Sequence, residues 1–133
     1  MSRYAIDAPT LLHLVAVDIP VSRQHQLVAP TVIRSQALAL LLTAVRSGEL
    51  DEDVALRHQD RMTELTMRLL GDRVSRRTAR RIAREHDWDS TYDAEYLAVA
   101  NFQADALVSV DPRMRAKAEG IVPLASLEAL TID

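Results

Sequence analysis

The stretch TYDAEYLAVANFQADALVSVD, residues 91–111, decides the fold of this chain. Its first part follows Ser90, a helix-capping residue with an acid three residues later, and continues as an apolar helix. Its second part, residues 106–110, is a β-rich apolar run that ends at Asp111 and Pro112, where another helix is expected. A helix, a short buried strand and a second helix in this order are typical of an α/β fold.

The beginning of the chain has the same organisation. Residues 4–6 form a short apolar run that ends at Asp7, and Pro9 then suits the first turn of a helix that ends before Pro20. The other expected elements are helices at about residues 30–47 (closed by Gly48), 51–70 and 72–86, and short strands at 27–29 and 121–122. Short strands that alternate with helices predict one α/β domain over residues 1–133, with a parallel sheet.

The composition supports one folded domain and removes several classes of function. Of the 133 residues, 48 % are apolar, which is enough for one sizeable core. The 3 glycines form neither the GxGxxG pattern of dinucleotide-binding proteins nor the GxxxxGK[ST] pattern of P-loop proteins. The absence of cysteine excludes disulfides, zinc–thiolate sites and cysteine nucleophiles. Since no apolar run approaches the roughly 18 residues of a membrane helix and no signal peptide is visible, we expect a cytoplasmic protein without a membrane partner.

Two of the expected strands end in aspartate, at Asp7 and Asp111. Because ligands bind beyond the carboxyl ends of the strands in an open parallel sheet, these two acids could converge on one site. Ser109 lies two residues before Asp111 and would point the same way along the strand. A single aspartate at a strand exit is more often a turn or cap residue, and Asp93, in a first helical turn, is by itself most simply a capping acid.

Three carboxylates that meet in one place repel each other unless a cation joins them. Hard oxygen ligands select Mg²⁺ or Mn²⁺, and these ions serve phosphoryl chemistry by polarising a phosphate and activating water. Gln36 is a polar residue near the apolar face of the 30–47 helix. It is either a buried amide bonded to neighbouring backbone, or a neutral oxygen ligand or water-orienting group.

Six arginines lie between Arg73 and Arg84, on one expected helix. Such a cluster attracts phosphate backbones, and it is equally compatible with a solvated helix face that nearby acids partly neutralise. We take Arg77, Arg80, Arg81 and Arg84 as candidates for guiding an RNA strand. The four histidines show no HExxH or other paired spacing, and no Ser/His/Asp elbow is present.

Three blocks of the sequence together resemble PIN-domain proteins, and among these the VapC-like ribonuclease toxins of bacterial toxin–antitoxin pairs. The likeness keeps the order of the motifs over nearly the whole chain, and its last block is the most specific. The blocks are YAIDAPTLLHLV at 4–15, LVAPTVIRSQALALLLTAVRSGEL at 27–50 and TYDAEYLAVANFQADALVSVDPRM at 91–114.

The resemblance implies a three-layer α/β/α sandwich with a short-stranded, mainly parallel sheet. The family's acids fall on Asp7, Asp93 and Asp111, with Ser109 at a neighbouring hydroxyl position, and they would hold Mg²⁺ or Mn²⁺. The implied activity is metal-dependent hydrolysis of RNA phosphodiesters, in which Ser109 and Gln36 would position water or phosphate. The implied partners are an RNA substrate, a cognate antitoxin protein and often a second copy of the chain in a homodimer.

One position departs from the family pattern. The family usually carries a glutamate where this chain has Gln36, which can offer a carbonyl oxygen but cannot act as a base. The chain is therefore either an active ribonuclease or a weakened or inactive PIN module that binds RNA or a protein without cutting. A receiver-like phosphoacceptor domain also places aspartates at strand ends. That interpretation needs a lysine at another strand end, whereas the single lysine, Lys117, lies in an expected helix.

Overall fold

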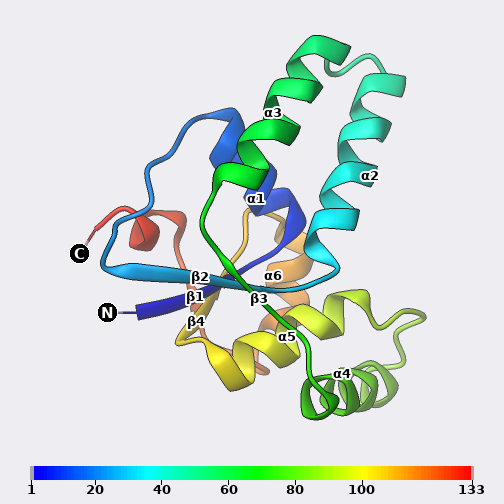
Figure 1. Cartoon of the computed structure of the whole chain (residues 1–133). Coiled ribbons are helices and arrows are strands. Elements are labelled where there is room, and N and C mark those ends of the chain that lie inside the picture. The colour runs from blue at the N-terminus through cyan, green and yellow to red at the C-terminus, as the bar shows by residue number, and fades with distance from the viewer. Residues whose placement is uncertain (1, 133) are drawn as a thin grey trace.

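The computed structural model describes residues 2–132, which fold around a five-stranded parallel sheet (Figure 1). The strands are β1 (Ser2–Ile6), β2 (His25–Pro30), β3 (Arg68–Leu70), β4 (Ala106–Val108) and β5 (Leu124–Ala125). Their order across the sheet is β3-β2-β1-β4-β5, and every neighbouring pair is parallel. The predicted α/β class with a short-stranded parallel sheet is confirmed.

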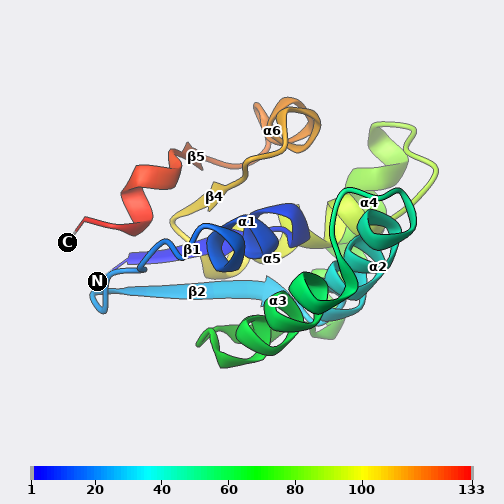
Figure 2. The same cartoon turned by 90° about the horizontal axis from the view of Figure 1, so that it is seen from above.

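Helices cover both faces of this sheet. They are α1 (Ala8–Ala16), α2 (Ile33–Arg46), α3 (Glu52–Glu64), α4 (Arg73–Glu85), α5 (Tyr92–Gln103) and α6 (Pro112–Ala118), followed by a short 3₁₀ helix (Leu127–Leu130). Figure 1 shows α1, α2 and α3 on one side of the sheet and α5 and α4 on the other, and Figure 2 gives the view from above. The helices α2 and α3 form a hairpin that projects from the sheet (Figure 1). This arrangement is the expected three-layer α/β/α sandwich.

The core follows from the strand sequences. Residues 5–6, 27–29 and 106–108 are apolar without alternation and are buried, as expected for strands covered by helices on both faces. In α5, every residue from Tyr96 to Ala100 is buried. The alanines in this helix let it lie close to the sheet and to α4. The middle of α5 is therefore fixed, and so is the direction in which its first turn points.

The strand order places a topological switch point between β1 and β4. From β1 the chain moves outward to β2 and β3, whereas from β4 it moves the other way to β5. The last residues of the two central strands, Ile6 and Val108, are direct neighbours in the register. Crevices at such a switch point bind ligands in open α/β sheets. The residues that follow β1 and β4 are therefore brought to the same place.

Several predicted boundaries were wrong. The helix expected over 51–70 ends at Glu64, and residues 68–70 form the edge strand β3 instead. The leucines at 65 and 69 continue the helical spacing, but they pack against the core from an extended chain. Pro30 ends β2 rather than opening the next helix, and the last strand lies at 124–125 rather than 121–122. Gly48, at φ +82°, follows α2 as expected.

Within residues 2–132, no helix has both the length and the apolar composition that crossing a membrane requires.

Candidate functional site

Asp7 lies at the junction of β1 and α1, and its side chain is 2 % exposed. It is the N-cap of α1, because its Oδ1 accepts a hydrogen bond from the backbone N–H of Thr10 at 3.2 Å. The hydroxyl of Thr10 also donates to this oxygen. Asp7 is therefore a cap residue and a buried site residue at once, and the helix start fixes the orientation of its carboxylate.

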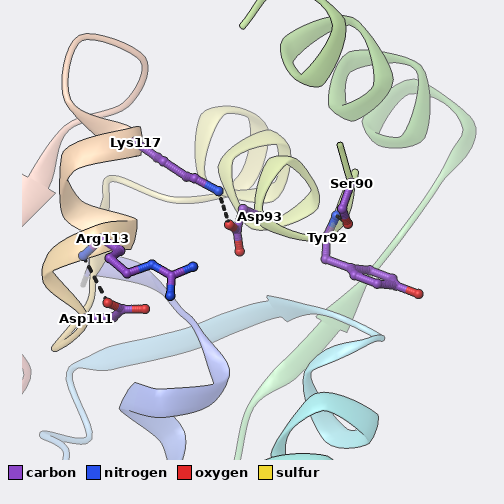
Figure 3. Close-up of polar contacts among 6 residues, drawn as sticks. All are labelled: Ser90, Tyr92, Asp93, Asp111, Arg113 and Lys117. Carbon is purple, nitrogen blue, oxygen red and sulfur yellow. Dashed lines mark hydrogen bonds and ion pairs between the residues drawn. The ribbon is translucent and has the colours of Figure 1, made fainter. Parts of the chain in front are cut away.

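Ser109 connects the ends of the two central strands. Its hydroxyl donates to Oδ2 of Asp7 at 2.7 Å and accepts from the backbone N–H of Asp111 at 3.1 Å. A second link runs from the backbone N–H of Val110 to the hydroxyl of Thr10 at 3.0 Å. Asp111 in turn caps α6, since its Oδ1 accepts from the backbone N–H of Arg113 at 2.9 Å (Figure 3). The predicted convergence of the two strand ends is confirmed.

The environment of Asp7 disfavours its negative charge. Burial raises the pKa of Asp7 above its ordinary value, the hydrogen bonds from Thr10 and Ser109 oppose part of this, and the negative charge of Asp111 raises it further. A carboxyl group in this situation favours either a proton or a nearby cation. The carboxylates at the ends of β1 and β4 would therefore be stabilised by a bound cation.

Asp93 enters the site from the first turn of α5 (Figure 3). The helix has Thr91 as its N-cap residue without a side-chain cap bond, and Ser90 Oγ accepts from the N–H of Tyr92 at 3.1 Å. The carboxylate of Asp93 does not bond back to this turn, so the capping-box interpretation is wrong. Its Oδ2 accepts instead from Nζ of Lys117 in α6, at 2.6 Å.

Gln36 reaches the site from α2. Its Oε1 accepts a hydrogen bond from the hydroxyl of Tyr96 in α5, so its partner is a side chain on the opposite layer rather than neighbouring backbone. Burial raises the pKa of Tyr96, and the negative charges of Asp7, Asp93 and Glu95 raise it further. The tyrosine therefore stays protonated and remains a donor to Gln36. With Oε1 held in this way, Nε2 of Gln36 makes no hydrogen bond within the described residues.

These side chains line one cavity of about 270 Å³. Its polar members come from four different elements or junctions and are Asp7, Gln36, Asp93, Tyr96 and Asp111. Its apolar members are Ala8, Pro9, Ala39, Leu40 and Met114. Ser109 is buried behind Asp7 and does not line the cavity. The structure therefore brings the three predicted acids and Gln36 to one cavity, with Ser109 as a support.

The donor chemistry of this cavity fits Mg²⁺ or Mn²⁺. Among the described residues, Oδ1 of Asp93 and Oδ2 of Asp111 accept no hydrogen bond, and Oδ2 of Asp7 accepts only one. Carboxylate oxygens with free lone pairs are the ligands that these ions prefer. As the side chains stand, however, no three acids or histidines within residues 2–132 are grouped so that they could hold an ion.

The arginines of α4 form an exposed face. All six side chains are exposed, while Ser75, Thr78, Ala79, Ile82 and Ala83 face the interior. Val74, in the first turn of α4, is 56 % exposed. Arg81 pairs with Glu85 at 3.5 Å, and this is the sole ion pair of α4 within residues 2–132. The candidates Arg77, Arg80, Arg81 and Arg84 lie on this face, outside the cavity but on the helix that precedes Asp93.

The sequence interpretation missed three residues that shape the site. Thr10 follows Asp7 at the spacing of a helix cap, so this contact had a local signal. Tyr96 lies one helical turn after Asp93, which puts both on one face of α5. Lys117 had no local signal, because its contact with Asp93 depends on how α6 packs beside α5.

Comparison with known proteins supports the fold. No family model matches the sequence, and no curated protein matches it either. The crystal structure of PAE2754 from Pyrobaculum aerophilum is similar, with a TM-score of 0.70 and 24 % sequence identity. The likeness covers 98 % of this chain and 94 % of that chain. This chain therefore shares an α/β fold with that protein over nearly its whole length, and a shared fold does not by itself imply a shared function.

Proposed function

We propose that this chain is a PIN-like, VapC-type endoribonuclease that hydrolyses RNA phosphodiesters with Mg²⁺ or Mn²⁺. One observation carries the proposal: Asp7, Asp93 and Asp111, which are far apart in the sequence, line a single cavity at the switch point of the sheet. The likeness of the sequence blocks to PIN-domain proteins supports the same residues.

In this proposal, Asp7, Asp93 and Asp111 hold the ion, directly or through water. A bound ion would supply Lewis-acid chemistry, which polarises a phosphate and activates water for in-line attack on phosphorus. Ser109 fixes the orientation of Asp7 through its 2.7 Å hydrogen bond. Gln36, held by Tyr96 through Oε1, directs its free amide N–H groups toward a phosphate oxygen or water.

The proposed substrate is RNA that approaches along the α4 face. Arg77, Arg80, Arg81 and Arg84 follow each other at helical spacing and are exposed, so they can contact successive phosphates. Trp88 and Tyr92 are the aromatic residues that follow this helix in the sequence, and so few aromatics favour contacts with the RNA backbone over base stacking.

The proposed protein partners are a cognate antitoxin and a second copy of the chain, acting in the cytoplasm. The family resemblance supports these partners. The helical hairpin also exposes apolar side chains that suit a protein surface, with Leu38 43 %, Leu42 56 % and Leu56 48 % exposed.

The alternative is a PIN module that binds RNA or protein without cutting it. Two observations favour this alternative. Gln36 cannot carry the negative charge of the usual glutamate, and Lys117 occupies an oxygen of Asp93.

The test is cleavage of RNA by the purified chain with Mn²⁺, compared with Asp7→Asn and with excess chelator. We expect the wild type to cleave and Asp7→Asn to lose at least about 100-fold in rate. Asn at this position can still cap α1, so the variant should fold. If the wild type and the variant are equally inert while both bind RNA, the binding module replaces the nuclease.

A further inference from the structure

Lys117 has two partners at the edge of the site, Asp93, which Figure 3 shows, and Trp88. Its Nζ lies 2.6 Å from Oδ2 of Asp93 and 4.9 Å from the ring centroid of Trp88. The side chains of Lys117 and Asp93 are 32 % and 37 % exposed, so the pair is partly shielded from water. Lys117 is also the single lysine of the chain.

The ammonium group occupies one of the acids that the proposed metal site needs. Asp93 lines the same cavity as Asp7 and Asp111, but one of its oxygens is engaged by Lys117. An ammonium group and a divalent ion both bind carboxylate oxygen, and their positive charges repel each other when both lie beside the same carboxylate. We propose that Lys117 is a tethered cation that competes with Mg²⁺ or Mn²⁺ for Asp93, so that the ion binds fully only when Lys117 moves away.

No other cation in the described chain takes this role. The guanidinium of Arg115, also on α6, donates to the backbone carbonyls of Ser109 and Ala125, each at 3.3 Å. Arg113 contacts Asp111 through its backbone N–H. Within residues 2–132, the Lys117–Asp93 pair is the sole ion pair that involves an acid of the cavity. The competition is therefore assigned to one side chain.

The structure offers Lys117 an alternative position. A lysine has a flexible stem, and the face of a tryptophan attracts an ammonium group. Trp88 already lies beside Nζ, so Lys117 can leave Asp93 without losing all of its favourable contacts. Trp88 precedes α5 and Lys117 lies on α6. The side chain of Lys117 can therefore move from Asp93 toward Trp88 without a movement of α5, the helix that carries Asp93.

Gln36 acts in the same direction as Lys117. An amide at this position leaves the cavity with one negative charge fewer than a glutamate would. The lysine compensates a further negative charge. Both features weaken the attraction for a divalent ion, so the site would respond to the concentration of free metal rather than hold an ion permanently.

This inference rests on the proposed metal site, and its test measures metal binding rather than cleavage. Mn²⁺ is titrated calorimetrically into the full chain, into Lys117→Met and into Lys117→Arg. We expect Lys117→Met to bind Mn²⁺ with a Kd about tenfold lower than the wild type, because the competing charge is gone. Lys117→Arg keeps the charge and should stay within about threefold of the wild type.

Arg61→Met is the matched control. It also removes one positive charge and breaks an ion pair with an aspartate, Arg61–Asp18 at 3.5 Å, outside the cavity. Its Kd for Mn²⁺ should therefore remain within about twofold of the wild type. An equal gain in Arg61→Met and Lys117→Met would show a general effect of net charge and would overturn the proposal.

Lys117→Met in an Asp93→Asn variant tests whether Lys117 competes with the ion through Asp93. The gain from Lys117→Met should disappear there, since the lysine then has no carboxylate to release. A gain that persists, or a Lys117→Met variant that binds Mn²⁺ no more tightly than the wild type, overturns the inference. If Lys117→Met binds more tightly but no variant cleaves RNA, the competition stands and the proposed nuclease fails. If the chain cleaves RNA but Lys117→Met does not bind Mn²⁺ more tightly, the proposed nuclease stands and the competition by Lys117 fails.

Discussion

The two ends of the sheet carry cavities of different kinds. At the amino ends of β2 and β3, a cavity of about 710 Å³ has a mixed lining of apolar, neutral polar and charged side chains, among them Arg23, Glu64 and Arg68. At the carboxyl ends of β1 and β4, the cavity is only about 270 Å³ but contains three acids. The larger cavity is therefore not the one with the more distinctive chemistry.

The difference lies in how the polar groups are held. In the smaller cavity, Asp7 is fixed by Thr10 and Ser109, and Gln36 is fixed by Tyr96, so partners from other elements orient them. In the larger cavity, Nε2 of His25 is hydrogen-bonded to the backbone carbonyl of Ile132, whereas its buried Nδ1 has no hydrogen-bond partner in the described chain. Polar groups that are held in fixed orientations, with acids placed close together, indicate a functional site better than the volume of a cavity does.

The largest expected effect is a difference in RNA cleavage between variants at the two ends of the sheet. Asp111→Asn should lower the rate of RNA cleavage at least about 100-fold, because it removes a charged ligand from the proposed metal site. Arg68→Gln, in the larger cavity, should leave the rate within about twofold. The measurement is cleavage of RNA under Mn²⁺, with circular dichroism to confirm folding. An equal loss in both variants would contradict the assignment of the smaller cavity as the active site.

A second variant tests whether the charge at position 36 limits metal binding in the smaller cavity. Gln36→Glu restores a negative charge, and the hydroxyl of Tyr96 can donate to the new carboxylate as it does to the amide. We expect the affinity for Mn²⁺ to rise roughly tenfold and cleavage to rise with it. Calorimetric titration of Mn²⁺ measures the first effect. No change in either quantity would mean that position 36 serves only the packing of α2 against α5.

The arginine face should act on RNA through its charge. Replacing Arg77, Arg80, Arg81 and Arg84 together by glutamine should weaken RNA binding. The slope of log affinity against log salt should fall by up to about 0.7 for each phosphate that is no longer neutralised. The matched double variant Arg23→Gln/Arg68→Gln, at the amino end of the sheet, should leave the slope unchanged. Equal slopes for all three proteins would exclude α4 as the RNA surface.

The smallest expected effect concerns stability without metal. Burial raises the pKa of Asp7 in the folded chain, so the folded state holds this proton more tightly than the unfolded state. The resulting stabilisation is present below the unfolded pKa and is lost as the pH rises through the folded pKa. Asp7→Asn keeps a capping oxygen and has no charge to bury. With chelator present, its Tm at about pH 7.5 should therefore exceed that of the wild type by a few degrees.

Thermal unfolding at about pH 4.5 and pH 7.5 checks this prediction. The gain should shrink at the lower pH, where Asp7 of the wild type holds its proton more often. Asp105→Asn, an exposed site at the amino end of the sheet, should change Tm little at either pH. A lower Tm for Asp7→Asn at about pH 7.5 would show that Asp7 is stabilised by its charge.

Local patterns predicted the parts of the site that depend on parallel strands. Asp7 and Asp111 follow two short apolar runs, and parallel strands deliver their carboxyl ends to one edge, so their meeting could be inferred from spacing alone. Asp93 could not be placed in this way, because its position depends on the packing of α5 against the sheet. Its assignment came from the resemblance, and the structure then placed it in the same cavity.

The failures have a common physical cause. A strand of three residues such as β3 carries too few side chains to show a period, so the apolar spacing of α3 extended through it. Lys117 and Tyr96 matter through contacts with other elements, which single-chain periodicity does not contain. Predictions from sequence were therefore best where a residue ends an element and weakest where two elements cross.

The link between the two central strands also has a consequence for biosynthesis. The bonds from Ser109 to Asp7 and from Val110 to Thr10 join residues that lie 102 and 100 positions apart in the sequence. A nascent polypeptide that still lacks these late residues has neither the second half of the pocket nor the strand that supports it. The cavity can therefore form only after residues 109–111 have been synthesised.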